Sequence, residues 1–119
     1  MFSAPTASAA AYCDHAGYTA SGEPMERCSS LSNGVLINKQ TLVDNNTAVY
    51  TTYDKTGGST VTVRLGYVYN GTHLSDAFSI SSGHTVRKHF GAPADAFCQS
   101  MTGLLSSSGS LYQTPSTHC

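Results

Sequence analysis

The chain contains little charge and no tryptophan. Only 11% of its 119 residues are charged and the formal net charge is −1, whereas about 25% of residues are charged in an ordinary domain. So small a net charge gives the whole molecule no electrostatic basis for binding nucleic acid. Carbohydrate sites usually rely on tryptophan, so its absence weakens an interpretation as a lectin. No apolar run approaches the roughly 18 residues of a transmembrane helix, and we expect no membrane span.

Familiar catalytic and metal-binding motifs are also missing. Serine is frequent, but the sequence contains no G-x-S-x-G elbow. The cysteines lack the close C-x-x-C spacing of structural zinc sites. We therefore expect no metal and no cofactor. No basic and apolar leader precedes Ala7-Ser8-Ala9, which has the small-x-small form of a signal-peptidase site. This pattern is typical of the mature N-terminus of an exported protein.

The four cysteines are Cys13, Cys28, Cys98 and Cys119. Four cysteines allow three pairings, and we favour Cys13–Cys28 and Cys98–Cys119 because each closes a short loop beside loosely held chain. In a chain-entropy model each bond stabilises the fold by about 2–4 kcal/mol. A disulfide at Cys119 ties down an end that would otherwise fray, whereas a frayed end cannot hold a reactive thiol in place. Two disulfides favour a secreted protein in an oxidising environment.

The chain length fits a single domain. Residues 1–11 are rich in Ala, Ser, Pro and Thr, and we expect a flexible segment there. Residues 12–119 are expected to form one disulfide-stapled domain, in which residues 12–33 make a turn-rich loop without a strand. From residue 34 onward, apolar and polar side chains alternate with a period of two. We predict strands at residues 34–40, 47–54, 60–69, 72–80, 84–90 and 110–114, and either a strand or a short helical turn at residues 96–105.

These six to seven short strands predict an all-β fold, an antiparallel β-sandwich or a small barrel. The clearest strand, TVTVRLGYVY, places Tyr67 and Tyr69 on the same face as Val61, Val63 and Leu65, so we expect both tyrosines to pack within the sheet. Asn70-Gly71 follows directly. An Asn-Gly pair between alternating runs is a strong hairpin signal, because both residues tolerate a positive φ.

Ionisable side chains provide one possible catalytic set. His84, His89 and Arg87 could combine with Glu23 or Glu26 into a ribonuclease-like site, since such a site needs a base, an acid and a cation for phosphate. The simpler interpretation is that these residues are solvated on strand faces. No spacing in the sequence requires a catalytic site, so we expect that the protein is not an enzyme.

Arg87, Lys88 and His89 form the one dense cationic stretch. Such a stretch can bind an acidic partner, or it can protect an edge strand against aggregation. Because successive strand residues alternate between the two faces of a sheet, only two of these three side chains can share a surface.

The chain has seven tyrosines, a residue type well suited to interfaces because it offers a large apolar area with a polar tip. Tyr50 is expected on the face opposite to Val49, toward solvent. Tyr12 and Tyr18, in the predicted disulfide loop, are further contact candidates.

Several segments together resemble small secreted β-proteins of soil actinobacteria: GVLINKQ, TAVYTTYDKTGGSTVTVRLGYVYNGTH, FCQSMTGLL and YQTPSTHC. In length and cysteine layout the chain is most similar to the adapter subunit of umbrella toxin particles, and more loosely to spore-associated proteins of these bacteria. The resemblance implies a non-enzymatic bridging role, in which one surface docks a repeat of a large toxin polypeptide and the N-terminal segment inserts into a lectin-like subunit. An extended segment can add a strand to a partner's sheet edge, and Phe2 and Pro5 are the contact candidates there.

The favoured hypothesis is therefore a secreted, non-enzymatic adapter of an extracellular assembly. Its expected partners are other secreted protein subunits, with carbohydrate involved only indirectly. The predicted partner-binding residues are Phe2, Pro5, Tyr12, Tyr18, Tyr50, Arg87 and Lys88. The alternative is a stand-alone antimicrobial toxin or a hydrolase inhibitor, and a small secreted hydrolase or nuclease is less favoured.

Overall fold

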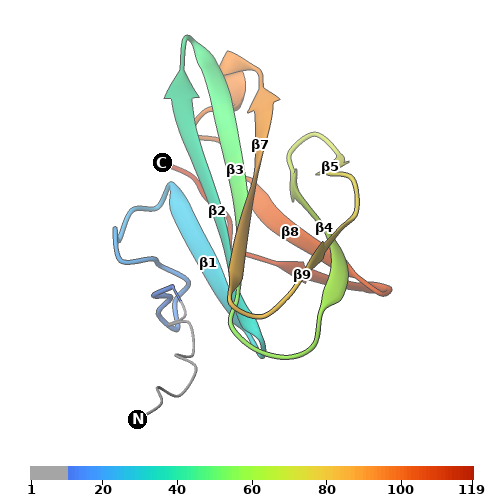
Figure 1. The fold of residues 1–119 in the computed structure, drawn as a ribbon. Helices are drawn as coiled ribbons and strands as arrows, with labels where there is room; N and C mark the ends of the chain where they lie inside the picture. The colour runs from blue at the N-terminus through green and yellow to red at the C-terminus, as the bar shows by residue number, and fades with distance from the viewer. Residues whose placement is uncertain (1–10) are drawn as a thin grey trace.

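Within residues 11–119, nine strands in two antiparallel sheets pack face to face as a sandwich (Figure 1). The computed structural model describes residues 11–119. Within that range the helical structure is limited to one 3-10 turn, η1 (Ala94–Ala96). The strands are β1 (Glu26–Leu31), β2 (Gly34–Val43), β3 (Asn46–Lys55), β4 (Val61–Val68), β5 (Thr72–Leu74), β6 (Phe78–Ile80), β7 (His84–Ala92), β8 (Thr102–Ser107) and β9 (Ser110–Gln113).

The two sheets differ in the number and the order of their strands. The first sheet has four strands in the order β1-β2-β3-β7, and the second has five, with the order β5-β4-β8-β9 and β6 paired to the beginning of β4. The chain crosses from the first sheet to the second after β3, returns at β7, and crosses again through η1 to β8 (Figure 1). β7 is therefore an edge strand of the first sheet, with β3 as its neighbour.

Alternation along the strands builds the core. On β4, Val63, Leu65 and Tyr67 are buried while Thr62 and Arg64 are exposed, as the period of two predicts. Tyr69, just beyond β4, is partly buried and packs against the second of two apolar clusters. The first cluster contains Leu36, Tyr53, Val63, Leu65, Ile80 and Leu105. The second contains Val49, Tyr67, Ala92, Ala96 and Met101.

The strand count is higher than the predicted six to seven, for two reasons. β1 lies within residues 12–33, where we expected a loop, because its sequence ERCSSL is polar and shows no clean alternation. It forms because every one of its residues pairs with β2 in antiparallel register. The predicted strand at residues 72–80 is two short strands, β5 and β6. Ser75 lies between them and is hydrogen-bonded to Leu65 of β4. Its N–H donates to the Leu65 carbonyl, and its hydroxyl oxygen accepts the Leu65 N–H.

The hairpin predicted at Asn70-Gly71 is present and joins β4 to β5. Both residues have positive φ, +50° at Asn70 and +105° at Gly71. A second hairpin of this kind joins β2 to β3 through Asp44 and Asn45, at φ +50° and +63°. Asp and Asn enter this left-handed region more readily than other non-glycine residues. At both hairpins, therefore, the residue types in the turn suit the positive φ that joining the two paired strands requires.

Both predicted disulfides are confirmed. Cys13 pairs with Cys28 on β1, and Cys98 pairs with Cys119. The second bond holds residues 114–119, which are also hydrogen-bonded to the core. In particular, the buried Gln40 side chain donates to the hydroxyl of Thr117 at 2.9 Å and accepts the N–H of Cys98 at 2.9 Å. No buried side-chain nitrogen or oxygen within residues 11–119 lacks a hydrogen-bond partner.

Candidate functional site

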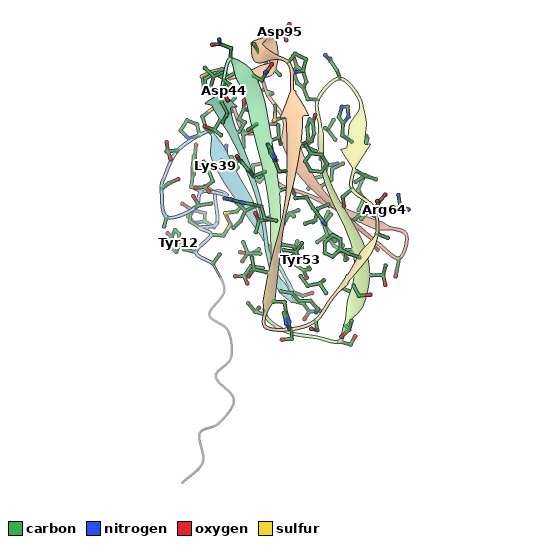
Figure 2. The ribbon with its side chains drawn as sticks, turned by 45° about the horizontal axis from the view of Figure 1, so that its top comes forward. Tyr12, Lys39, Asp44, Tyr53, Arg64 and Asp95 are labelled. Atoms are coloured by element: carbon green, nitrogen blue, oxygen red, sulfur yellow. A yellow bond between two sulfur atoms is a disulfide. The ribbon has the colours of Figure 1, made fainter. Side chains whose placement is uncertain are left out.

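The first sheet presents an aromatic and cationic surface on the side that faces away from the second sheet. The antiparallel register places Tyr50 of β3 between Lys39 of β2 and His89 of β7. Two residues further along β3, on the same face, Thr52 lies beside Arg87 of β7. We call these five residues the Tyr50 surface. Figure 2 shows Lys39 projecting from one side of the sandwich and Arg64 from the other, with Tyr53 between the sheets.

The Tyr50 ring contacts two side chains of β7. It stacks on the His89 ring, with the two ring centroids 4.9 Å apart and the planes inclined by 18°. The Arg87 guanidinium carbon lies 4.5 Å from the Tyr50 centroid, within the range of a cation–π contact. Arg87 and His89 are exposed and Tyr50 is half-buried. The three side chains therefore form a partly solvated cluster across β3 and the edge strand β7.

The two carboxylates nearest to the Tyr50 surface, those of Glu26 and Asp54, accept hydrogen bonds from neutral donors. Glu26, the register partner of Lys39, accepts hydrogen bonds from the hydroxyls of Thr19 and Ser21 at 2.7 and 2.9 Å. Asp54 accepts the N–H of Ala11 and the hydroxyl of Thr85, both at 2.9 Å. The cationic groups of the Tyr50 surface are thus left available to an external anion.

Lys88 lies on the other face of β7. Its ammonium nitrogen lies 4.8 Å from the centroid of the Phe78 ring, on the side of the first apolar cluster. The prediction that only two of the three cationic residues share a surface is confirmed, and the two are Arg87 and His89. Lys88 cannot act together with Arg87 on one flat partner surface, since strand geometry points them in opposite directions.

The remaining predicted contact residues are scattered. The Tyr18 ring is covered by the Arg27 guanidinium at 4.1 Å, and Arg27 also donates to the carbonyls of Gly17, Ala16 and Ser116. Tyr18 thus contributes to internal packing. Tyr12 is 62% exposed. Phe2 and Pro5, with the rest of residues 1–10, lie outside the described residues.

Hydrogen bonds order the turn of the N-terminal disulfide loop. The Asp14 carboxylate accepts the N–H groups of Tyr18 and Ala16 at 2.8 and 2.9 Å. The bond from Tyr18 above all lowers the pKa of Asp14, because it stabilises the carboxylate form. Tyr18 is therefore held at its backbone as well as at its ring.

Of the candidate ribonuclease-like residues, only Arg87 and His89 share a surface, and the others lie elsewhere. His84 and His89 lie on opposite faces of β7, where His84 pairs with the buried Lys55 and His89 with the outward-facing Tyr50. Glu26 shares a face with His89, but it lies on β1, three strand spacings or about 14 Å away. Glu23 is in the exposed loop before β1. A base, an acid and a phosphate-binding cation therefore do not meet in this arrangement.

The part of the chain that the structure describes contains neither a metal-binding cluster nor a membrane-spanning helix. Among residues 11–119, no group of three or more His, Cys, Asp or Glu side chains is placed to hold a metal ion. Over the same range, no helix has the length and apolar character needed to cross a membrane. Comparison of the chain with protein-family models, with curated proteins and with solved structures finds no match.

Proposed function

We propose that this protein is a secreted, non-enzymatic binding module that bridges protein subunits of an extracellular assembly. We further propose that its Tyr50 surface binds an acidic segment of one partner. The observation that carries the proposal is the stacked arrangement of Arg87, Tyr50 and His89 on the outer face of the first sheet. The two disulfides are consistent with an exported protein.

The geometry suits recognition because the side chains are ordered before a partner arrives. Ordering a free side chain at an interface costs about 0.5–1.5 kcal/mol, and stacking on Tyr50 already restricts both Arg87 and His89. Arginine offers a planar fork that binds a carboxylate through two parallel hydrogen bonds. Tyrosine and arginine are also the residue types that dominate binding energy at protein interfaces. An acidic partner segment would thus meet a preorganised site.

The proposal is tested with the tagged protein in its native host. Proteins that copurify with it from culture fluid are identified, and the interaction with the stoichiometric partner is then measured with purified components. We expect Arg87→Glu to weaken this interaction at least tenfold. Arg64→Glu is the matched control, because Arg64 is an exposed arginine on the outer face of the second sheet. Binding should weaken as salt is raised, since the contact is ionic and partly exposed.

Two outcomes would contradict this proposal. If Arg87→Glu binds the partner as well as the wild-type protein does, the Tyr50 surface is not the binding site. If the protein is recovered as a monomer without any stoichiometric partner and inhibits bacterial growth by itself, the stand-alone toxin is the better interpretation. Insertion of residues 1–10 into a second partner stays a prediction, and deletion of those residues tests it separately from Arg87→Glu.

A further inference from the structure

A small cavity opens between the two sheets where β3 ends. It has a volume of about 120 Å³, and its apolar wall includes Leu31 of β1, Val61 and Val63 of β4, and Leu105 of β8. Tyr53 of β3 and Tyr112 of β9 complete the aromatic part of the lining, and Figure 2 shows Tyr53 between the sheets in this part of the molecule. The cavity lies inside the sandwich, whereas the Tyr50 surface faces outward.

Lys55 is the charged group in this cavity. It is the last residue of β3, it lines the cavity, and it is only 1% exposed. Within residues 11–119 its ammonium group donates one hydrogen bond, to the carbonyl oxygen of Gly57. An ammonium group has three donors, so two remain for another acceptor. A buried lysine with this much unused donor capacity is unusual.

The protein supplies no carboxylate to balance this charge. The chain has seven Asp and Glu residues, and none of them lines the cavity. Asp54 precedes Lys55 directly but faces outward, where it accepts hydrogen bonds from Ala11 and Thr85. His84, the register partner of Lys55, bonds through its ring to the Ser81 hydroxyl at 3.0 Å. Because buried charges in proteins are normally paired, an ammonium that has no carboxylate partner in this cavity favours an anionic ligand.

The two tyrosines of the cavity add hydrogen-bonding hydroxyl groups without adding charge. Burial raises the pKa of Tyr53, and the neighbouring Tyr112 raises it further. The Tyr53 hydroxyl therefore stays protonated at neutral pH and remains a potential donor. The cavity thus combines one cation, two phenols and the polar residues Ser32, Asn33 and Ser107 with a wall of aliphatic side chains.

We infer that this cavity binds a small carboxylate with a short aliphatic tail, its carboxylate on Lys55 and its tail against Val61, Val63 and Leu105. The volume limits the ligand to the size of a four- or five-carbon acid, since a dry cavity of about 150 Å³ is just large enough for benzene. Inorganic anions would match the charge but leave the apolar wall without contacts. The proposal does not depend on the function assigned to the Tyr50 surface.

The first test uses the wild-type protein with labelled methyl groups and butyrate as the probe. We expect saturable NMR shifts at the methyls of Val61, Val63 and Leu105, with a dissociation constant on the order of 1 mM for so small a ligand. Leu104 is the internal control, because it is fully buried but does not line the cavity. Butan-1-ol, which has the same tail without the charge, should bind at least tenfold more weakly.

The second test uses variants. Lys55→Met should weaken butyrate binding at least tenfold, whereas the outward-facing control Lys39→Met and the Tyr50-surface variant Arg87→Glu should leave it unchanged. Three results would overturn the inference: no saturable shift with butyrate, equal binding of butyrate and butan-1-ol, or full binding by a folded Lys55→Met protein. Formate that binds as tightly as butyrate would overturn the assignment of the tail to the aliphatic wall. If Lys55→Met does not fold, the comparison of butyrate with butan-1-ol decides.

Discussion

Tyr50 and Tyr53 lie three residues apart on β3, and their side chains lie on opposite faces of the same sheet. Tyr53 is 5% exposed and belongs to the first apolar cluster, together with Leu36 and Leu65. Tyr50 is half-buried and contacts the exposed Arg87 and His89. Composition cannot distinguish the two tyrosines. Their position in the alternation of the strand makes one a part of the core and the other a part of the candidate binding surface.

The same division runs through the neighbouring strands. On β2, Gln40 points inward and bonds to the residues around Cys98 and Thr117, while the adjacent Lys39 points outward beside Tyr50. On β7, Lys88 points inward over Phe78, while Arg87 points outward. We therefore expect substitutions on the inner face to change stability, and substitutions on the outer face to change binding.

The largest expected effect is on the inner face at Tyr53. Tyr53→Ala should lower the free energy of unfolding by about 3–5 kcal/mol, because it removes a large aromatic side chain from the core and leaves a cavity. Urea denaturation followed by circular dichroism measures this change. Tyr53→Phe is the matched control, since it keeps the ring and should retain most of the stability. A loss below about 1 kcal/mol in Tyr53→Ala would show that the inner face is less tightly packed than the structure indicates.

The next effect concerns the polar part of the inner face. Gln40→Ala should cost about 2–3 kcal/mol, because it removes the hydrogen bonds that the buried amide makes to the N–H of Cys98, the carbonyl of Gln99 and the hydroxyl of Thr117. Urea denaturation measures the cost, and amide hydrogen exchange should be faster at Cys98. Lys39→Ala, one residue away on the outer face, should change stability by less than about 0.5 kcal/mol. Equal effects from the two substitutions would remove the distinction between the faces on β2.

A smaller effect is expected from alkaline pH. Burial raises the pKa of Tyr53 and Tyr67 above its usual value of about 10. The folded protein thus holds these phenolic protons more tightly than the unfolded chain does. The resulting stability is complete below about pH 10 and is lost as the pH rises through the raised values of the folded state.

Thermal unfolding at a series of pH values, together with phenolate absorbance, tests this prediction. The melting temperature should fall above about pH 10, and the double variant Tyr53→Phe/Tyr67→Phe should show a shallower decline. If the double variant declines as steeply as the wild-type protein, other groups are responsible for the alkaline loss.

The smallest effect on stability is expected on the outer face at Tyr50. Tyr50→Ala removes cross-strand contacts with Arg87 and His89, which are worth about 0.2–1 kcal/mol. Partner binding should nevertheless fall at least tenfold, because Arg87 loses the ring that holds it in place. Tyr50→Phe should preserve both properties, since stacking needs the ring. A Tyr50→Ala protein that is strongly destabilised but still binds its partner would reverse the roles that we assign to the two faces.

The resemblance to actinobacterial adapter proteins and the function proposed from it are hypotheses. The proposed function places partner binding on the outer surface of the first sheet. Alternation correctly predicted that Tyr50 lies on the side of β3 opposite to Val49, and that two of the three cationic residues at 87–89 share a surface. It did not identify the partners of Tyr50, because Tyr50 and His89 are separated by 39 positions in the chain. The pairing of β3 with β7 in one particular register brings them together. Lys39, on β2, was missed for the same reason.

Local chemistry was enough for much of this protein. The period of two predicted the inward row of β4, Asn70-Gly71 predicted its hairpin, and the cysteine spacing predicted both disulfides. Each of these features depends on neighbouring residues or on the closure of a short loop. β1, the break at Ser75, the Tyr50 surface and the Lys55 cavity were decided only by the tertiary structure. Each depends on which distant strands lie side by side. That pairing is fixed only when the two sheets pack together and bury their inner faces, so it cannot be read from neighbouring residues in the sequence.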